Sequence, residues 1–194
     1  MAGAKQISVL FLPALITLTL LTAGCENDLR DIKKISASEV NKPLEEYTGV
    51  DVLYSDSAYV KAHLTAPLML DYDKLKNPYI EMPKGVKVVF YDKNMQQTCT
   101  ITADYGIRHE KEKLIELRKN VVGTNAKGET FNSDELIWDE GSKMIHSDKL
   151  VHVRMADGSL TDGTSFVSDE NLEHWKLNQA TGIIHVNSQD VPQQ

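Results

Sequence analysis

The stretch "TADYGIRHEKEKLIELRKNVVGTNAKGE" at residues 102–129 recurs as "NSDELIWDEGSKMIHSDKLVHVRMADGS" at residues 132–159, an offset of 30 residues without a gap. Nine of the 28 aligned positions are identical, where about two are expected by chance from ordinary residue frequencies. Such a repeat predicts a fold built from copies of one supersecondary unit. The identical pairs are Asp104/Asp134, Ile107/Ile137, Glu110/Glu140, Lys113/Lys143, Ile115/Ile145, Lys119/Lys149, Val121/Val151, Ala126/Ala156 and Gly128/Gly158.

Each copy consists of strand, turn, strand and turn. The charged turns "HEKEK" and "DEGSK" recur at one end of the unit, and the glycine-bearing turns "NAKGE" and "ADGS" recur at the other. A third copy begins at residue 162, where Val167, Asp169, Glu170 and Trp175 fall on the positions of Ile107, His109, Glu110 and Ile115. One unit cannot bury its apolar face alone, so neighbouring units must stack. The repeat therefore predicts a twisted antiparallel stack of hairpins around a common interior.

The same period-two pattern extends upstream of the repeat, in "YVKAHLTAPLML" (59–70) and "VKVVFYD" (86–92). Turn-rich pieces such as "DKNM" separate these runs, and no long amphipathic helical pattern appears after residue 50. We therefore predict one all-β domain over residues 51–187, followed by a short tail at 188–194.

The first 24 residues are typical of a secretory signal peptide. Lys5 precedes the apolar run "ISVLFLPALITLTLL", and the small residues "TAG" follow it. Because Cys25 comes directly after "AG", the segment resembles a bacterial lipoprotein signal, which implies cleavage before Cys25 and acylation of this residue. An uncleaved membrane anchor is the alternative. Residues 25–50 are polar and are predicted to form a tether.

The second cysteine, Cys99, lies in the strand-like run "QQTCTIT" and is interpreted as a small buried apolar residue. A disulfide with Cys25 is not favoured, because nothing in the sequence brings the two together. The six histidines are scattered without ligand spacing, so no metal site and no cofactor are predicted.

Charge and motifs narrow the function classes further. The formal net charge is −7 and becomes −8 without residues 1–24, which argues against nucleic-acid binding. No nucleophile elbow and no phosphate-binding loop is present, so we predict that the protein is not an enzyme. Asp134, Glu135, Asp139 and Glu140 are interpreted as solvated turn acids. Trp138 and Trp175 are interpreted as packing residues, with sugar stacking as the alternative.

Four blocks, in sequence order, are "MPKGVKVVFYD" (82–92), "ADYGI" (103–107), "KLIELRKNVVGTNAKGETFNSDELIWDEGSKMIHSDKLVHV" (113–153) and "LTDGTSFVSDENLEHWKLNQATG" (160–182). Together they resemble the LptC family, the periplasmic component of the lipopolysaccharide export machinery. The resemblance implies a twisted, boat-like β-jellyroll. It also implies that lipopolysaccharide passes through an interior groove, from a transporter of LptB, LptF and LptG towards an LptA-like bridge protein. Catalysis is not implied for this subunit.

The resemblance places the chain at the periplasmic face of the inner membrane, here with a lipid anchor. Two rival interpretations remain open: an outer-membrane lipoprotein that binds carbohydrate or another ligand, and a structural β protein with a dry closed core. Alternate apolar strand positions are predicted to line the groove, and a shift by one residue would exchange the set. They are Val88, Phe90, Ile101, Ala103, Ile107, Ile115, Leu117, Val121, Leu136, Trp138, Ile145, Val151, Val153 and Phe166.

Overall fold

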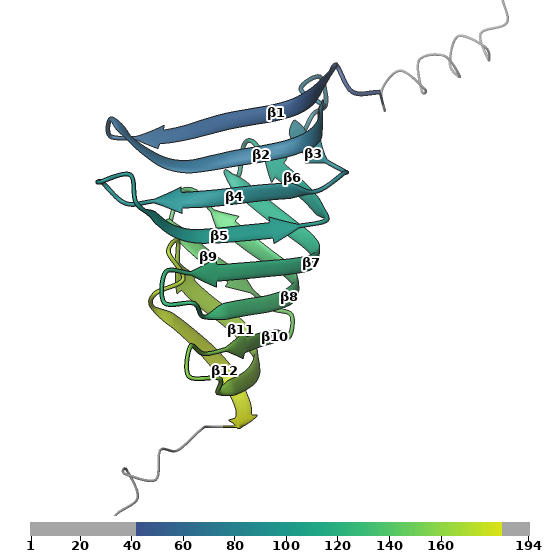
Figure 1. Cartoon of the computed structure of the whole chain (residues 1–194). Coiled ribbons are helices and arrows are strands. Elements are labelled where there is room, and N and C mark those ends of the chain that lie inside the picture. The colour runs from purple at the N-terminus through teal and green to yellow at the C-terminus, as the bar shows by residue number, and fades with distance from the viewer. Residues whose placement is uncertain (1–41, 184–194) are drawn as a thin grey trace, which may run out of the picture. The chain divides into compact units, whose positions relative to one another are not determined.

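A computed structural model describes residues 42–183, which form one antiparallel sheet and contain no helix. This confirms the predicted all-β jellyroll of stacked hairpins, and Figure 1 shows the stack extending from β1 and β2 at one end to β12 at the other. The strands of this part of the chain are β1 (Glu45–Asp56), β2 (Tyr59–Asp71), β3 (Tyr79–Met82), β4 (Val86–Tyr91), β5 (Gln97–Ala103), β6 (Tyr105–His109), β7 (Leu114–Asn125), β8 (Thr130–Asp139), β9 (Met144–Ser147), β10 (Val151–Arg154), β11 (Leu160–Asp169) and β12 (Trp175–Ile183).

The sheet begins earlier than the sequence predicts. Strand β1 starts at Glu45, inside the stretch 25–50 that was expected to be a tether. Most β1 side chains are exposed, so this strand lacks the apolar alternation that marks the others. The predicted signal peptide at 1–24, Cys25 and the tail at 188–194 lie outside the described residues. Between residues 42 and 183, no helix is long and apolar enough to span a membrane.

The sheet folds into two layers, because the long strands change pairing partners midway. In β7, residues 114–118 pair with β6, whereas residues 122–125 pair with β5. Strands β2, β8 and β11 divide between two partners in the same way. We call the part that contains β4, β5 and β10 layer 1, and the part that contains β3, β6 and β9 layer 2.

The chain crosses between the layers along one edge of the sandwich. In β7 the crossing is a bulge at Lys119 and Asn120, which have φ angles of 63° and 48°. Ser165 in β11 and Gln179 in β12 also have positive φ, 53° and 50°. Such bulges bend a strand sharply enough to carry it from one layer into the other.

The hairpin turns line the opposite edge, which we call the mouth. Layer 1 contributes the turns at 57–58, 92–96, 126–129 and 155–159, and layer 2 those at 72–78, 110–113, 140–143 and 170–174. Equivalent turn positions of the two repeat copies have nearly the same backbone conformation. Lys113 and Lys143 have φ angles of 55° and 59°, and Gly128 and Gly158 have φ angles of 81° and 86°.

The core lies between the layers and is continuous along the stack. Phe90 of layer 1 packs edge-on against Trp138 of layer 2, with ring centroids 4.8 Å apart. Farther along, Phe131 of layer 1 contacts Phe166 of layer 2 at 5.4 Å. Cys99 belongs to this core and is 1% exposed, as its predicted role as a small buried residue requires.

Candidate functional site

The predicted groove-lining residues all lie in the two-layer core except Ile107. Val88, Phe90, Ile101, Ala103, Ile115, Leu117, Val121, Leu136, Trp138, Ile145, Val151, Val153 and Phe166 are all buried. Their alternation therefore identifies the inward face of the strands in the correct register.

Ile107 faces away from the interior. It is only half-buried, and its partners across the sheet are Glu81 and Glu116. The neighbouring Gly106 takes the inward position, where a Cβ atom would lie 2.9 Å from Val86 Cγ1. The chain changes layers at Asp104, between β5 and β6, and this crossing shifts the alternation by one residue.

A pocket of about 270 Å³ opens between the layers at the end of the stack formed by β1, β2 and β3. Its walls are largely apolar and come from both layers. The lining residues are Val52, Leu53, Tyr54, Ala62, Leu64, Met69, Ile80, Met82, Arg108, Ile115, Trp138 and Glu140. Only Ile115 and Trp138 belong to the set predicted from the sequence.

Aromatic rings form the inner wall of this pocket. Trp138 lies between Tyr54 of β1 and Phe90 of β4, with edge-on contacts at centroid distances of 5.8 Å and 4.8 Å. The indole N–H of Trp138 donates to Glu170 Oε1 at 2.9 Å. Burial raises the pKa of Glu170, although the hydrogen bond from Trp138 acts in the opposite direction. Trp138 is 2% exposed, so its ring offers no open face on which a sugar could stack.

One charged pair stands in the pocket wall. Arg108 donates from Nε and Nη2 to the two carboxylate oxygens of Glu140, at 2.9 Å and 3.0 Å. This bidentate contact raises the pKa of Arg108. The interpretation of Glu140 as a solvated turn acid is wrong, because its side chain is only 6% exposed. Its place in the repeat concealed this role, since its counterpart Glu110 is much more exposed.

A second ion pair spans the mouth beside the pocket. Lys143, in the turn between β8 and β9, donates to Asp56 Oδ2 of layer 1 at 2.6 Å. The hydrogen bond from Lys143 is the main cause of the lowered pKa of Asp56. Both side chains remain partly exposed, so the pair holds the mouth weakly.

A family model described as "Lipopolysaccharide-assembly, LptC-related" matches residues 16–185. The chain belongs to the LptC family. No protein in a search of curated proteins matches it. Membership makes the chain a component of lipopolysaccharide transport, with association at the periplasmic side of the inner membrane.

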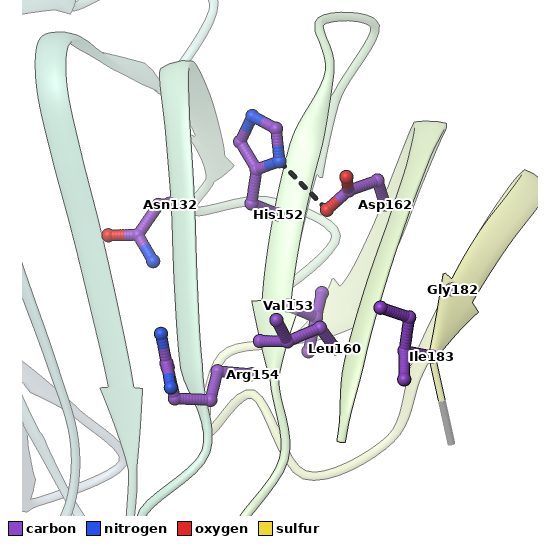
Figure 2. A pocket seen from close by; sticks show the side chains of 8 residues that line it. All are labelled: Asn132, His152, Val153, Arg154, Leu160, Asp162, Gly182 and Ile183. Atoms are coloured by element: carbon purple, nitrogen blue, oxygen red, sulfur yellow. Dashed lines mark hydrogen bonds and ion pairs between the residues drawn. The ribbon is translucent and has the colours of Figure 1, made fainter. Parts of the chain in front are cut away.

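For an LptC-family protein, the apolar pocket is the natural candidate site, and the other hollows are less suitable. A hollow of about 340 Å³ lies over β8, β10, β11 and β12, and Figure 2 shows the side chains that line it. His152 Nδ1 lies 2.8 Å from Asp162 Oδ1, an ordinary pair across neighbouring strands. Asn132 and Arg154 are exposed, so this hollow belongs to the outer face. Among residues 42–183, no three His, Cys, Asp or Glu side chains converge as metal ligands would.

Most of the lining residues that sequence reasoning missed lie on the first three strands, outside the repeat, and the other two, Arg108 and Glu140, lie within it. In β2, Leu64 and Met69 both line the pocket, although residues an odd number of positions apart face opposite sides of a regular strand. The strand pairs with β4 through residues 62–65 and with β3 through residues 70–71, so it changes layers between the two. The break at Pro67 in an otherwise apolar run was the available signal.

Proposed function

We propose that the chain is a non-enzymatic carrier that receives lipopolysaccharide from an inner-membrane ABC transporter and passes it towards the outer membrane. The observation that carries this proposal is the apolar pocket between the layers, open at one end of a continuous apolar core. Acyl chains gain about 0.8 kcal/mol per buried CH₂ group, so such an interior favours them over water.

The size of the pocket defines how it would work. Its volume of about 270 Å³ is slightly below the range of about 300–1,000 Å³ typical of small-molecule sites. The resting pocket therefore accommodates part of an acyl chain, and fuller occupancy requires the layers to separate. Weak, partial burial suits a carrier, because the ligand must also leave.

The ends of the stack support a place in a chain of proteins. Among the strands of residues 42–183, β1 pairs only with β2 and β12 pairs only with β11, so each has an edge that no other described strand covers. Such edges accept a strand from a partner, which would continue the sheet and its interior into the next protein. We propose the LptB, LptF and LptG transporter and an LptA-like bridge protein as the neighbours.

Photo-crosslinking tests the binding site. A photoreactive residue at Leu64, which lines the pocket, should capture lipopolysaccharide in cells. His63 is the matched control, because it neighbours Leu64 on β2 and pairs with the exposed Asp51. Capture at position 64 but not at position 63 is expected. Equal yields at both positions, or no capture at 64, would contradict the proposed site.

We propose that an acyl group on Cys25 anchors the protein to the inner membrane. The lipoprotein-like "TAGC" at residues 22–25 and the polar stretch that follows it support this proposal. Labelling of cells with a fatty-acid analogue should tag the wild-type chain and not the Cys25→Ala variant. Persistent labelling of the variant would place the acyl group elsewhere, and an untagged wild-type chain would favour a retained apolar segment.

A further inference from the structure

The third copy of the repeated turn differs from the first two in one informative way. Glu112 and Ser142 occupy equivalent positions in the turns at 110–113 and 140–143, and both are exposed. The equivalent residue in the third turn is Leu172, which is 0% exposed. Its φ angle is 57°, a left-handed conformation that is costly for a leucine. The turn therefore folds inwards and places an apolar side chain in the core.

The opposite layer is shaped to receive this side chain. Gly123 of β7 lies beneath it, and a Cβ atom at Gly123 would be 2.7 Å from Leu172 Cδ1. The side-chain amide of Asn125 donates to the Leu172 carbonyl oxygen at 2.9 Å. Asn125 is 5% exposed, so this bond is shielded from water.

Two further contacts join the turn and the residue that follows it to layer 1 across the mouth. In the turn, Thr98 Oγ1 donates to Asn171 Oδ1 at 2.6 Å, and at the start of β12 Trp175 Nε1 donates to Glu129 Oε2 at 3.4 Å. The turn is ordered internally by Asp169, which accepts from the backbone N–H of Glu173 at 2.9 Å. Three of the described polar contacts across the mouth thus involve this turn or the residue that follows it, and the pair of Lys143 and Asp56 lies elsewhere.

We infer that the turn Asp169–His174 is a latch that closes the mouth over the C-terminal half of the core. When the latch opens, the space held by the Leu172 side chain becomes available to an acyl chain. This role rests on the proposed function as a lipopolysaccharide carrier, and it gives a reason why the described pocket lies at the β1 end rather than beside the latch. Opening breaks a few contacts of one turn and leaves the strand pairing intact, so it is a local event.

Cys99 provides a native reporter of the latch. It neighbours Thr98 on β5 and is 1% exposed. Burial, and to a smaller extent the negative charge of the nearby Asp169, raises the pKa of its thiol to about 12. In the full-length Cys25→Ser chain it is the sole thiol. The rate at which a disulfide reagent labels Cys99 therefore measures how often its surroundings open.

Two variants should release the latch, and each has a matched control. Leu172→Ala removes the inserted side chain, and Gly123→Ala displaces it. Leu136→Ala is the control for the first, because it truncates an equally buried leucine away from the mouth. Thr124→Ala, beside Gly123, is the control for the second. We expect labelling of Cys99 to rise at least about tenfold in both latch variants, with little dependence on low urea concentrations, as local opening requires.

If the labelling rate of Cys99 depends on urea as strongly in Leu172→Ala as in Leu136→Ala, labelling follows global unfolding. That result would overturn the latch. A second readout uses photoreactive residues at Leu177, which packs on the C-terminal half of the core, and at Leu64 in the pocket. The latch variants should increase capture of lipopolysaccharide at position 177 and leave capture at 64 unchanged. Unchanged capture at 177 despite capture at 64 also contradicts the latch. If no lipopolysaccharide is captured at either position in any variant, the proposed function is contradicted. The labelling rates of Cys99 would still show whether the latch opens.

Discussion

The pair formed by Arg108 and Glu140 is the most consequential polar contact at the scale of single residues. It brings two opposite charges into the wall of an apolar pocket, where neither is fully hydrated. Glu140 is almost completely buried, whereas about a third of the Arg108 side chain is exposed. Such a pair contributes little net stability, but each partner requires the other. Its bidentate geometry fixes the turn between β8 and β9 against β6.

Removal of the acid from this pair should be costly. Glu140→Ala leaves the half-buried guanidinium of Arg108 with the longer contact to Glu110, at 3.8 Å, as its one remaining ion pair among residues 42–183. We expect the free energy of unfolding to fall by about 2–3 kcal/mol, somewhat less than for a fully buried pair. Glu135→Ala is the control, because its partner Arg118 is 46% exposed, and should cost less than about 1 kcal/mol. Urea titrations measure both, and equal losses would refute the prediction.

The pH dependence of stability should reveal Glu170. Burial raises its pKa in the folded state, so the ionised carboxylate is disfavoured there relative to the unfolded chain. At neutral pH this group therefore destabilises the fold, and the penalty disappears as the pH falls through the raised pKa and then the unfolded pKa. Glu170→Gln should be more stable than the wild type at pH 7 and lose that advantage near pH 4, as measured by thermal unfolding. An advantage that is independent of pH would contradict this explanation.

At the scale of elements, the crossing bulges determine the architecture. A regular strand would continue in one layer, but β7 changes partners at Lys119 and Asn120. The backbone N–H of Asp104 donates to the Lys119 carbonyl oxygen at 3.0 Å, which binds the bulge to the adjacent crossing. Both bulge residues are exposed. Their backbone conformation, rather than side-chain burial, is therefore what the fold requires of them.

A β-branched residue at this crossing should lower the stability of the fold. Lys119 has a φ angle of 63°, and Lys119→Val is expected to lower the free energy of unfolding by about 1–2 kcal/mol because of the left-handed conformation. Lys119→Gly should be nearly neutral, since relief of strain offsets the greater flexibility of the unfolded chain. Thr124→Val, in the same strand with regular pairing, should change stability by less than about 0.5 kcal/mol. If Lys119→Val is tolerated as well as Thr124→Val, the bulge does not constrain the fold.

The repeat made the elements predictable, and the crossings limited that prediction. Inside the repeat, a strict period of two places Leu117, Leu136 and Ile145 on the correct face. At the crossing between β5 and β6 the parity changes, which explains why Ile107 faces outwards, whereas the two-residue bulge of β7 keeps Leu117 and Val121 on the same face. Burial of Glu140 depends on its contact with Arg108 of β6 in the same layer, and burial of Leu172 depends on contacts with β7 in the opposite layer. Sequence spacing carries no information about those contacts, so the latch and most of the pocket could not be predicted.

At the scale of the whole molecule, charge and apolar burial have opposite effects on the proposed ligand. The chain carries a net charge of −7, and lipopolysaccharide is itself anionic through its phosphate groups. Long-range electrostatics therefore opposes binding, and burial of acyl chains must supply the affinity. A carrier of this kind differs from a protein that captures lipopolysaccharide through a basic patch, and the two respond oppositely to salt.

Salt should selectively strengthen the binding of an anionic amphiphile. Dodecyl phosphate and dodecylphosphocholine, both used below their micelle concentrations, share one apolar chain and differ in net charge. Raising the salt concentration from 0.1 M to 1 M shortens the screening length from about 10 Å to about 3 Å. The Kd of dodecyl phosphate should therefore fall relative to that of dodecylphosphocholine, because only the anion is repelled. The ratio of the two constants removes the general effect of salt on apolar burial, and calorimetry measures both. If that ratio moves in the other direction, a cationic subsite contributes to recognition and the apolar pocket is not sufficient for binding.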